Sequence, residues 1–151
     1  MSKISYDVIG TRSAPATLTT AYSGNTTTRD CRYFPNLQLE ILYTPLSGQS
    51  NRYALILVEL STDAGTTYIP ISTKLNDTTE IEVYVEGDTS TTGIPITIPG
   101  DHTSTGGVVY KGIIPLGDIA ADKVKISARE DGAANFGTLF VGLTLSNQDV
   151  D

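Results

Sequence analysis

The sequence predicts an all-β protein, an antiparallel β-sandwich, with the jelly roll among the topologies that its strand pattern allows. Short segments in which apolar and polar residues alternate recur at intervals of about 8 to 12 residues, as they do in sandwiches and barrels. Turn-forming residues, chiefly Gly, Pro, Asp and Asn, separate these segments. No stretch of about ten residues or more has apolar side chains at helical spacing. These observations together favour strands packed in two layers.

The composition limits the partners that this chain can have. Its 151 residues suffice for one domain with its own core, and its net charge of −7 opposes binding to nucleic acid or to an anionic membrane. Cys31 is the single cysteine, so an intrachain disulfide is excluded. The N-terminus lacks the apolar segment of a signal peptide, and no apolar run approaches the roughly 18 residues of a membrane helix. We therefore expect synthesis in the cytoplasm.

Residues 1–36 differ in composition from the rest of the chain, and we expect them to form a Thr-rich N-terminal arm or edge segment. The one strand that their pattern favours, residues 16–22, has few and small apolar side chains. Two interpretations are open: the segment is a poorly ordered terminus or first edge strand of its own chain, or it docks on a neighbouring subunit. The β-sandwich domain then spans residues 37–146, and residues 147–151 form a polar tail that is expected to fray.

The centre of the predicted domain is a hairpin over residues 52–73. Its first strand holds the longest apolar run in the chain, residues 54–58, and the Asp and Gly residues that follow the strand supply the turn. Apolar side chains occupy both faces of this strand, whereas a two-layer sandwich buries only one face of each sheet. We therefore expect the second face, Tyr53, Leu55 and Leu57, to be covered by the N-terminal arm or by a neighbouring subunit.

Period-two alternation predicts the other strands as well. Proline residues bracket or interrupt some of them, which is typical of sheet edges because proline cannot donate a ladder hydrogen bond. The strand at residues 80–86 has an acidic outer face, and the strand at residues 123–129 has a basic outer face. The expected strands outside the hairpin cover residues 37–43, 80–86, 94–99, 108–115, 123–129 and 138–145.

Side chains that the alternation directs away from the core mark a candidate interface. Tyr84 and Phe140 point outward on their strands, and tyrosine is enriched in protein contacts because it joins apolar area to a hydrogen-bonding group. The basic face is expected either to meet an acidic partner, such as the face of residues 80–86 in a neighbouring copy, or to be solvated. The predicted interface residues are Tyr53, Leu55, Leu57, Tyr84, Phe140, Lys123, Lys125 and Arg129.

The sequence lacks the motifs that catalysis or cofactor binding would require. A P-loop, a dinucleotide-binding glycine motif, a nucleophile elbow and zinc-ligand spacing are all absent. His102 is the single histidine and lies in a glycine-rich loop with no nucleophile signature around it. The loop aspartates do not have the alternating spacing of a dedicated calcium site. We predict no catalytic residue, no cofactor and no metal site, and therefore a protein that is not an enzyme.

Several stretches resemble a known class of proteins. They are Tyr43-Thr44-Pro45, the strand of residues 53–61, the turn of residues 62–68, and the closing stretches of residues 124–130 and 135–138. Across residues 37–146 the chain is similar to small β-sandwich virion structural proteins of tailed bacteriophages, which serve as capsid decoration, head-fibre or tail-associated components. The resemblance implies a protein that is made in the host cytoplasm and located in the virion, and it implies no catalytic residues.

Two functions are compatible with these features. The first is a non-enzymatic virion structural protein that forms a homo-oligomer, such as a trimer, and contacts other virion proteins through β-edges and tyrosine-rich faces. The alternative is a carbohydrate- or cell-surface-binding β-sandwich module. The absence of tryptophan argues against the alternative, since the largest stacking platform for a sugar ring is missing.

Overall fold

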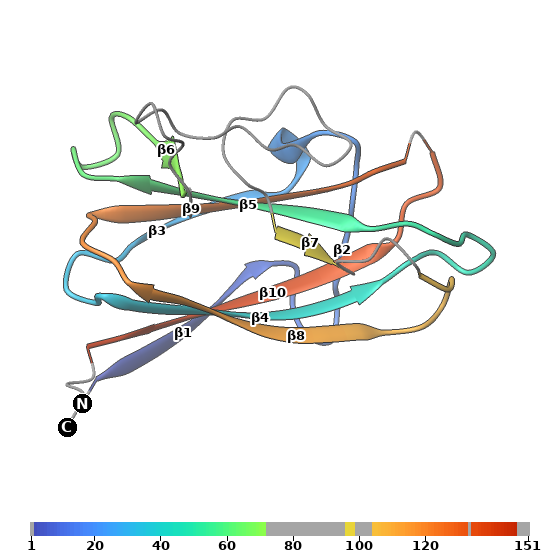
Figure 1. The fold of residues 1–151 in the computed structure, drawn as a ribbon, viewed down its shortest axis with the longest axis horizontal. Helices are drawn as coiled ribbons and strands as arrows, with labels where there is room; N and C mark the ends of the chain where they lie inside the picture. The colour runs from blue at the N-terminus through green and yellow to red at the C-terminus, as the bar shows by residue number, and fades with distance from the viewer. Residues whose placement is uncertain (1, 72–95, 99–103, 133, 148–151) are drawn as a thin grey trace, which may run out of the picture.

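A computed structural model describes residues 2–71, 96–98, 104–132 and 134–147 of the chain. The described strands form two antiparallel sheets that stack as a sandwich (Figure 1). The prediction of an all-β sandwich is confirmed, while the jelly-roll topology stays a prediction. The expected strand at residues 80–86, with Tyr84, lies outside the described residues.

Each sheet has a mixed strand order, so that neighbours in a sheet are mostly distant in sequence. Sheet A has the order β1-β10-β4-β8, and the short strand β2 also pairs with β10; their bounds are β1 (Lys3–Ile9), β2 (Ala16–Thr17), β4 (Asn36–Thr44), β8 (Tyr110–Asp118) and β10 (Thr138–Ser146). Sheet B has the order β3-β9-β5-β6, and β7 also pairs with β5; their bounds are β3 (Thr26–Asp30), β5 (Ala54–Ser61), β6 (Ile69–Pro70), β7 (Ile96–Ile98) and β9 (Lys123–Glu130). A 3-10 turn, η1 (Tyr22–Gly24), precedes β3.

The N-terminal segment is built into both sheets of its own chain. Strand β1 forms an edge of sheet A and β3 forms an edge of sheet B, and the two edges meet on one side of the sandwich. There the Thr27 hydroxyl donates a hydrogen bond to the Val8 carbonyl oxygen, and the Arg29 guanidinium lies 4.6 Å from the centre of the Tyr6 ring. Residues 3–9 and 26–30 thus form edge strands of this chain, and within the predicted strand at residues 16–22 the structure has only the short strand β2.

The core lies between the sheets and follows the predicted alternation. On β4 the buried side chains are Leu37, Leu39, Ile41 and Tyr43, and on β10 they are Leu139, Val141, Leu143 and Leu145. Sheet B contributes alternate residues of β5 and β9 to the same cluster. Because successive side chains on a strand point to opposite faces, the remaining residues of these strands form the two outer faces of the sandwich.

Candidate functional surfaces

The outer face of sheet B brings together six of the predicted interface residues. Tyr53, Leu55 and Leu57 project from β5 or the residue before it, and Lys123, Lys125 and Arg129 project from the neighbouring strand β9. Leu55 pairs with Arg129 across the two strands, which places an apolar and a cationic side chain next to each other on this face. Period-two alternation predicted the side of its own strand on which each residue lies, and the pairing of β5 with β9 brings the two sets together.

Contacts within the chain already occupy this face. Leu55 has no exposed surface, and the Arg129 guanidinium lies 5.4 Å from the centre of the Tyr22 ring. The Lys125 ammonium lies 4.5 Å from the centre of the Tyr68 ring and 3.4 Å from a carboxylate oxygen of Glu59. Since Tyr22 belongs to η1, part of the expected cover for this face comes from the N-terminal segment of the same chain. Lys125 has its acidic partner in its own sheet.

Phe140 lies on the opposite side of the molecule, on the outer face of sheet A, where it pairs with Leu42. Its ring is buried, and the Arg12 guanidinium lies 5.1 Å from the ring centre and forms an ion pair with Glu40. Arg12 reaches this position because the turn between β1 and β2 begins at Gly10, whose positive φ of 60° a residue with a side chain rarely adopts. The structure therefore separates Phe140 from the other described interface residues.

Exposed apolar side chains gather where β4 ends and β8 begins. We call this group the apolar end; it consists of Leu46, Val108, Val109 and Ile113, which are between 42% and 64% exposed. The loops that carry the first three are held together by a 2.8 Å hydrogen bond from the Gly107 amide to the Pro45 carbonyl oxygen. The apolar end adjoins an open hollow of about 560 Å³ on the outer face of sheet A, whose lining combines Val109, Ile113 and Leu42 with the charged residues Arg12, Glu40 and Lys111.

The sequence contains a signal for the apolar end that period-two alternation does not account for. The pairs Val108-Val109 and Ile113-Ile114 put apolar residues at consecutive positions. Val108 and Val109 precede β8 and are both exposed. Within a strand, one member of such a pair faces outward. Ile114 packs against the core, and Ile113 is exposed.

Strand β8 has a hydrogen-bonded neighbour on one side only among the described strands, but its edge is poorly suited to strand addition. It carries Lys111 and Pro115, and Gly117 has a φ of 80° beside a break in the register with β4. Lysine, proline and register breaks are features by which sheet edges avoid pairing with other chains. Contacts along the β8 edge are therefore expected through side chains and not through backbone pairing.

A buried carboxyl group, that of Glu130, lies in the core near the same end. The Tyr43 hydroxyl donates a hydrogen bond of 3.0 Å to one of its oxygens, and the Gly137 amide donates a bond of 2.6 Å to the other. Burial raises the pKa of Glu130, and burial together with the neighbouring Glu130 raises the pKa of Tyr43. A carboxyl with a raised pKa is a candidate acid in a cleft. Glu130 has no exposed surface, so its role here is to join β9, β4 and the start of β10.

The loop aspartates at the other end of the sandwich organise a turn. The Asp63 carboxylate accepts hydrogen bonds from the Thr67 amide at 2.8 Å and from the Ser61 hydroxyl at 2.7 Å, which lower the pKa of Asp63. Asp122 accepts a bond of 2.9 Å from the Ala64 amide. Within the described ranges, no three His, Cys, Asp or Glu residues are grouped so that they could hold a metal ion.

Two further observations bear on chemistry and location. The Cys31 thiol is buried, and burial followed by the charge of Asp30 raises its pKa to about 11, which makes it unreactive at neutral pH. In the part of the chain that the structure describes, no helix has the length and apolar character needed to cross a membrane.

Comparison with family models, with curated proteins and with solved structures gives no match for this chain.

Proposed function

We propose that this protein is a non-enzymatic virion structural component, a capsid decoration or a head- or tail-associated protein, that assembles with copies of itself through the apolar end. The feature that carries the proposal is the gathering of exposed apolar side chains at that end. Single exposed hydrophobic residues are normal on a protein, but a group of them at one end favours a contact surface. The sequence resemblance to tailed-phage virion proteins supports the location.

The surroundings of the apolar end suit a permanent contact. Backbone hydrogen bonds hold the loops that carry Leu46 and Val108, so association costs little backbone entropy there. Lys111 stands between Val109 and Ile113 on the outer side of β8, and no ion pair engages it among the described residues. It therefore adds a charged group that can fix the orientation of a partner carrying a carboxylate.

The first test is the state of the purified protein and its presence in particles. At micromolar concentration, native mass spectrometry should give the mass of a homo-oligomer such as a trimer. Peptides of this chain should also be detected in virus particles purified from the cells that produce it. A monomeric protein that is absent from the particles would show the proposal to be wrong.

A matched pair of variants locates the contact. Ile113→Glu places a charge in the apolar end and should weaken self-association at least about tenfold, because it removes an apolar contact and buries an unpaired charge. Ile69→Glu is the control, since Ile69 is also more than half exposed but lies on β6 of sheet B. If both variants dissociate to the same extent, or neither does, the contact is not at the apolar end.

A further inference from the structure

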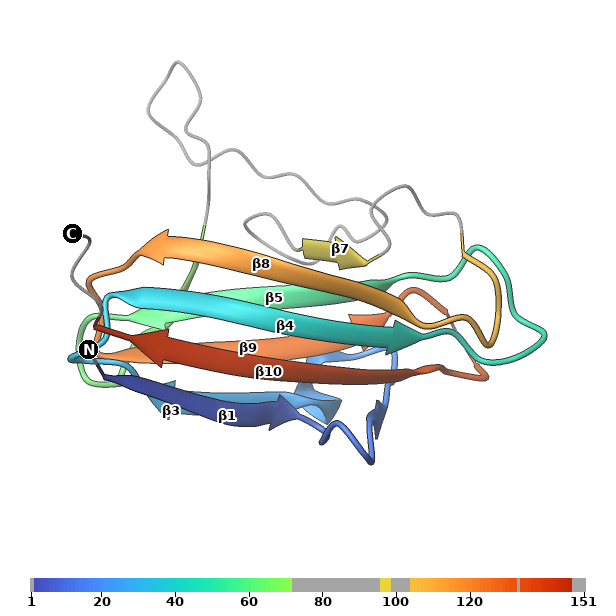
Figure 2. The same ribbon diagram turned by 90° about the horizontal axis from the view of Figure 1, so that it is seen from below.

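We propose that the outer face of sheet A carries a binding site for an acidic sugar unit, at the end of the sheet opposite the apolar end. This inference goes beyond the proposed function and does not depend on it. The site is a hollow of about 280 Å³, which we call the polar hollow; its lining includes Lys3, Asn36, Gln38, Pro115, Thr144 and Ser146. Figure 2 shows the four strands that form it, running in the order β8, β4, β10 and β1.

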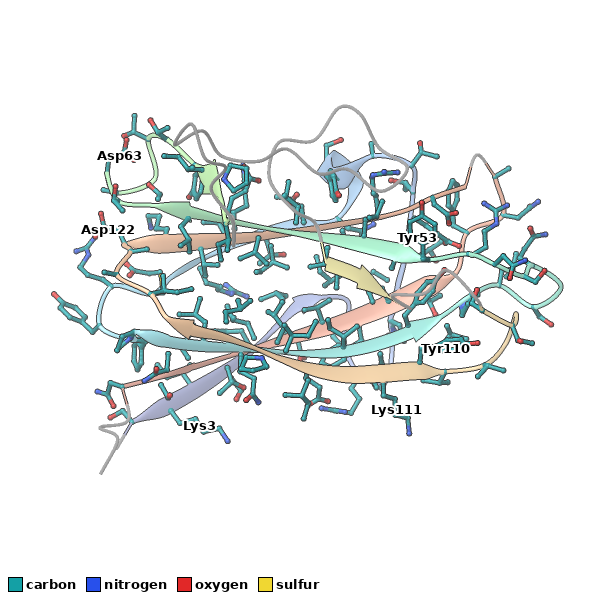
Figure 3. The ribbon with its side chains drawn as sticks, viewed as in Figure 1. Lys3, Tyr53, Asp63, Tyr110, Lys111 and Asp122 are labelled. Carbon is teal, nitrogen blue, oxygen red and sulfur yellow. The ribbon has the colours of Figure 1, made fainter. Side chains whose placement is uncertain are left out.

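Strand pairing brings these side chains into two rows across the sheet. In the first row Lys3 pairs with Ser146, Ser146 pairs with Asn36, and Asn36 pairs with Asp118. In the second row Thr144 pairs with Gln38, which pairs with Pro115. The rows face away from the core, because the residues that alternate with them on β4 and β10 are buried. Figure 3 shows Lys3 and Lys111 at opposite ends of sheet A, both on the side away from sheet B.

The lining groups match the hydrogen-bonding needs of a sugar. Hydroxyl and amide side chains both donate and accept hydrogen bonds, as sugar hydroxyls do, and Thr144, Ser146 and Gln38 present such groups. The exposed Pro115 ring adds an apolar wall against which the C–H face of a sugar can pack. With no aromatic platform in the lining, affinity rests on hydrogen bonds, so we expect dissociation constants on the order of 1 mM for a single sugar unit.

The charge of the hollow selects an acidic ligand. Lys3 supplies an ammonium group that has no ion-pair partner among the described residues, and Asp118, the acidic residue that pairs with Asn36, lies at the far end of the first row, three strands away from Lys3. A bond from an ammonium to a carboxylate is roughly twice as strong as a bond between neutral groups. The backbone beside Lys3 is held in place, because the Ser2 amide donates to the Asn147 side chain at 2.8 Å and the Asn147 amide donates to the Ser2 carbonyl oxygen at 3.2 Å.

The size and position of the hollow fit a single sugar unit on a free surface. Its volume lies just below the range of roughly 300–1,000 Å³ that is usual for small-molecule sites, so it holds about one ring. The rise of a strand places the two ends of β4 about 25 Å apart. The polar hollow is at one end and the apolar end at the other, so an assembly formed through the apolar end leaves the hollow open.

The test is an NMR titration of the isotope-labelled full chain with glucuronate and with glucose, which differ at one carbon. Glucuronate should cause saturable shifts of the amide signals of Lys3, Gln38 and Thr144, and glucose should bind at least about fivefold more weakly. Lys3→Gln should abolish this preference, whereas Lys111→Gln, which removes the other lysine of this face, should preserve it. Thr144→Val, which keeps the side-chain shape, should weaken both sugars alike.

Several outcomes would overturn the inference. One is the absence of saturable shifts with either sugar, and another is a set of shifts outside the polar hollow. A third is an equal response to acetate, which would mean that Lys3 binds any carboxylate and that the hollow does not recognise the sugar. Ile113→Glu should keep the glucuronate response, so a failure of the assembly proposal and a failure of this one are distinguishable.

Discussion

Replacing Glu130 with alanine should lower the free energy of unfolding by about 2–5 kcal/mol, since each buried donor left without a partner costs about 1–3 kcal/mol. The substitution leaves the Tyr43 hydroxyl and the Gly137 amide without their acceptor inside the core. It also empties the space of a side chain that has no exposed surface. Chemical denaturation followed by circular dichroism at neutral pH measures the loss.

Glu130→Gln is the matched control for this prediction. Its amide oxygen can accept the bond from Gly137, and its amide N–H can donate to the Tyr43 hydroxyl oxygen, so both connections are kept without a charge. We expect the stability of this variant to lie within about 1 kcal/mol of the parent or above it. Equal losses for the alanine and glutamine variants would mean that the charge, and not the two hydrogen bonds, holds this end of the sandwich together.

Comparison of Glu130→Gln with the parent protein also tests how the stability depends on pH. Burial raises the folded-state pKa of Glu130 above the usual value of 4.5, so the folded protein holds this proton more tightly than the unfolded chain. The contribution of Glu130 is therefore fully present below the unfolded pKa and is lost as the pH rises through the folded pKa. The stability of Glu130→Gln relative to the parent should increase over that interval. A difference that does not change with pH would contradict the raised pKa.

Local pattern predicted the parts of this fold that depend on one strand at a time. Alternation placed Leu39 and Leu143 in the core, and continued from Ala128 it also places Glu130 there, one residue beyond the predicted end of that strand at residue 129. The edge strand β1 was missed because most of its side chains are exposed, although Tyr6 and Val8 keep the alternation. Edge strands bury little, so their apolar signal is weak.

The candidate surfaces differ in the same way: one grouping depends on two neighbouring strands, and the others depend on the fold of the whole chain. The grouping of Leu55 with Arg129 needs only two regular neighbouring strands, whereas the cover over Arg129 depends on where the N-terminal chain turns at Tyr22. The polar hollow draws on four strands that are distant in sequence, from Lys3 to Thr144. Strand order is set by the packing of the whole sandwich, and no local pattern contains it.

Gly137→Ala should be as damaging as the loss of Glu130, at about 3 kcal/mol, because overpacking against a backbone that cannot shift costs about 1–3 kcal/mol or more. A β-carbon at this position would lie 2.8 Å from Cα of Pro45 and closer still to the carbonyl oxygen of Thr44. The same residue donates its amide to Glu130 and accepts a bond of 3.0 Å from the Leu18 amide. Displacing it therefore disturbs β4, β9 and the N-terminal segment together.

Gly112→Ala supplies the control, since a β-carbon there would meet nothing within 4 Å, and we expect this variant to unfold at the same denaturant concentration as the parent or slightly above it. Gly137 also adjoins the loop that carries Leu46, whose amide nitrogen would lie 3.1 Å from the added carbon. Gly137→Ala should thus weaken self-association as well as stability. If it unfolds like Gly112→Ala and keeps the parent oligomer mass, the junction of β4 and β10 is not the rigid support that the apolar end requires.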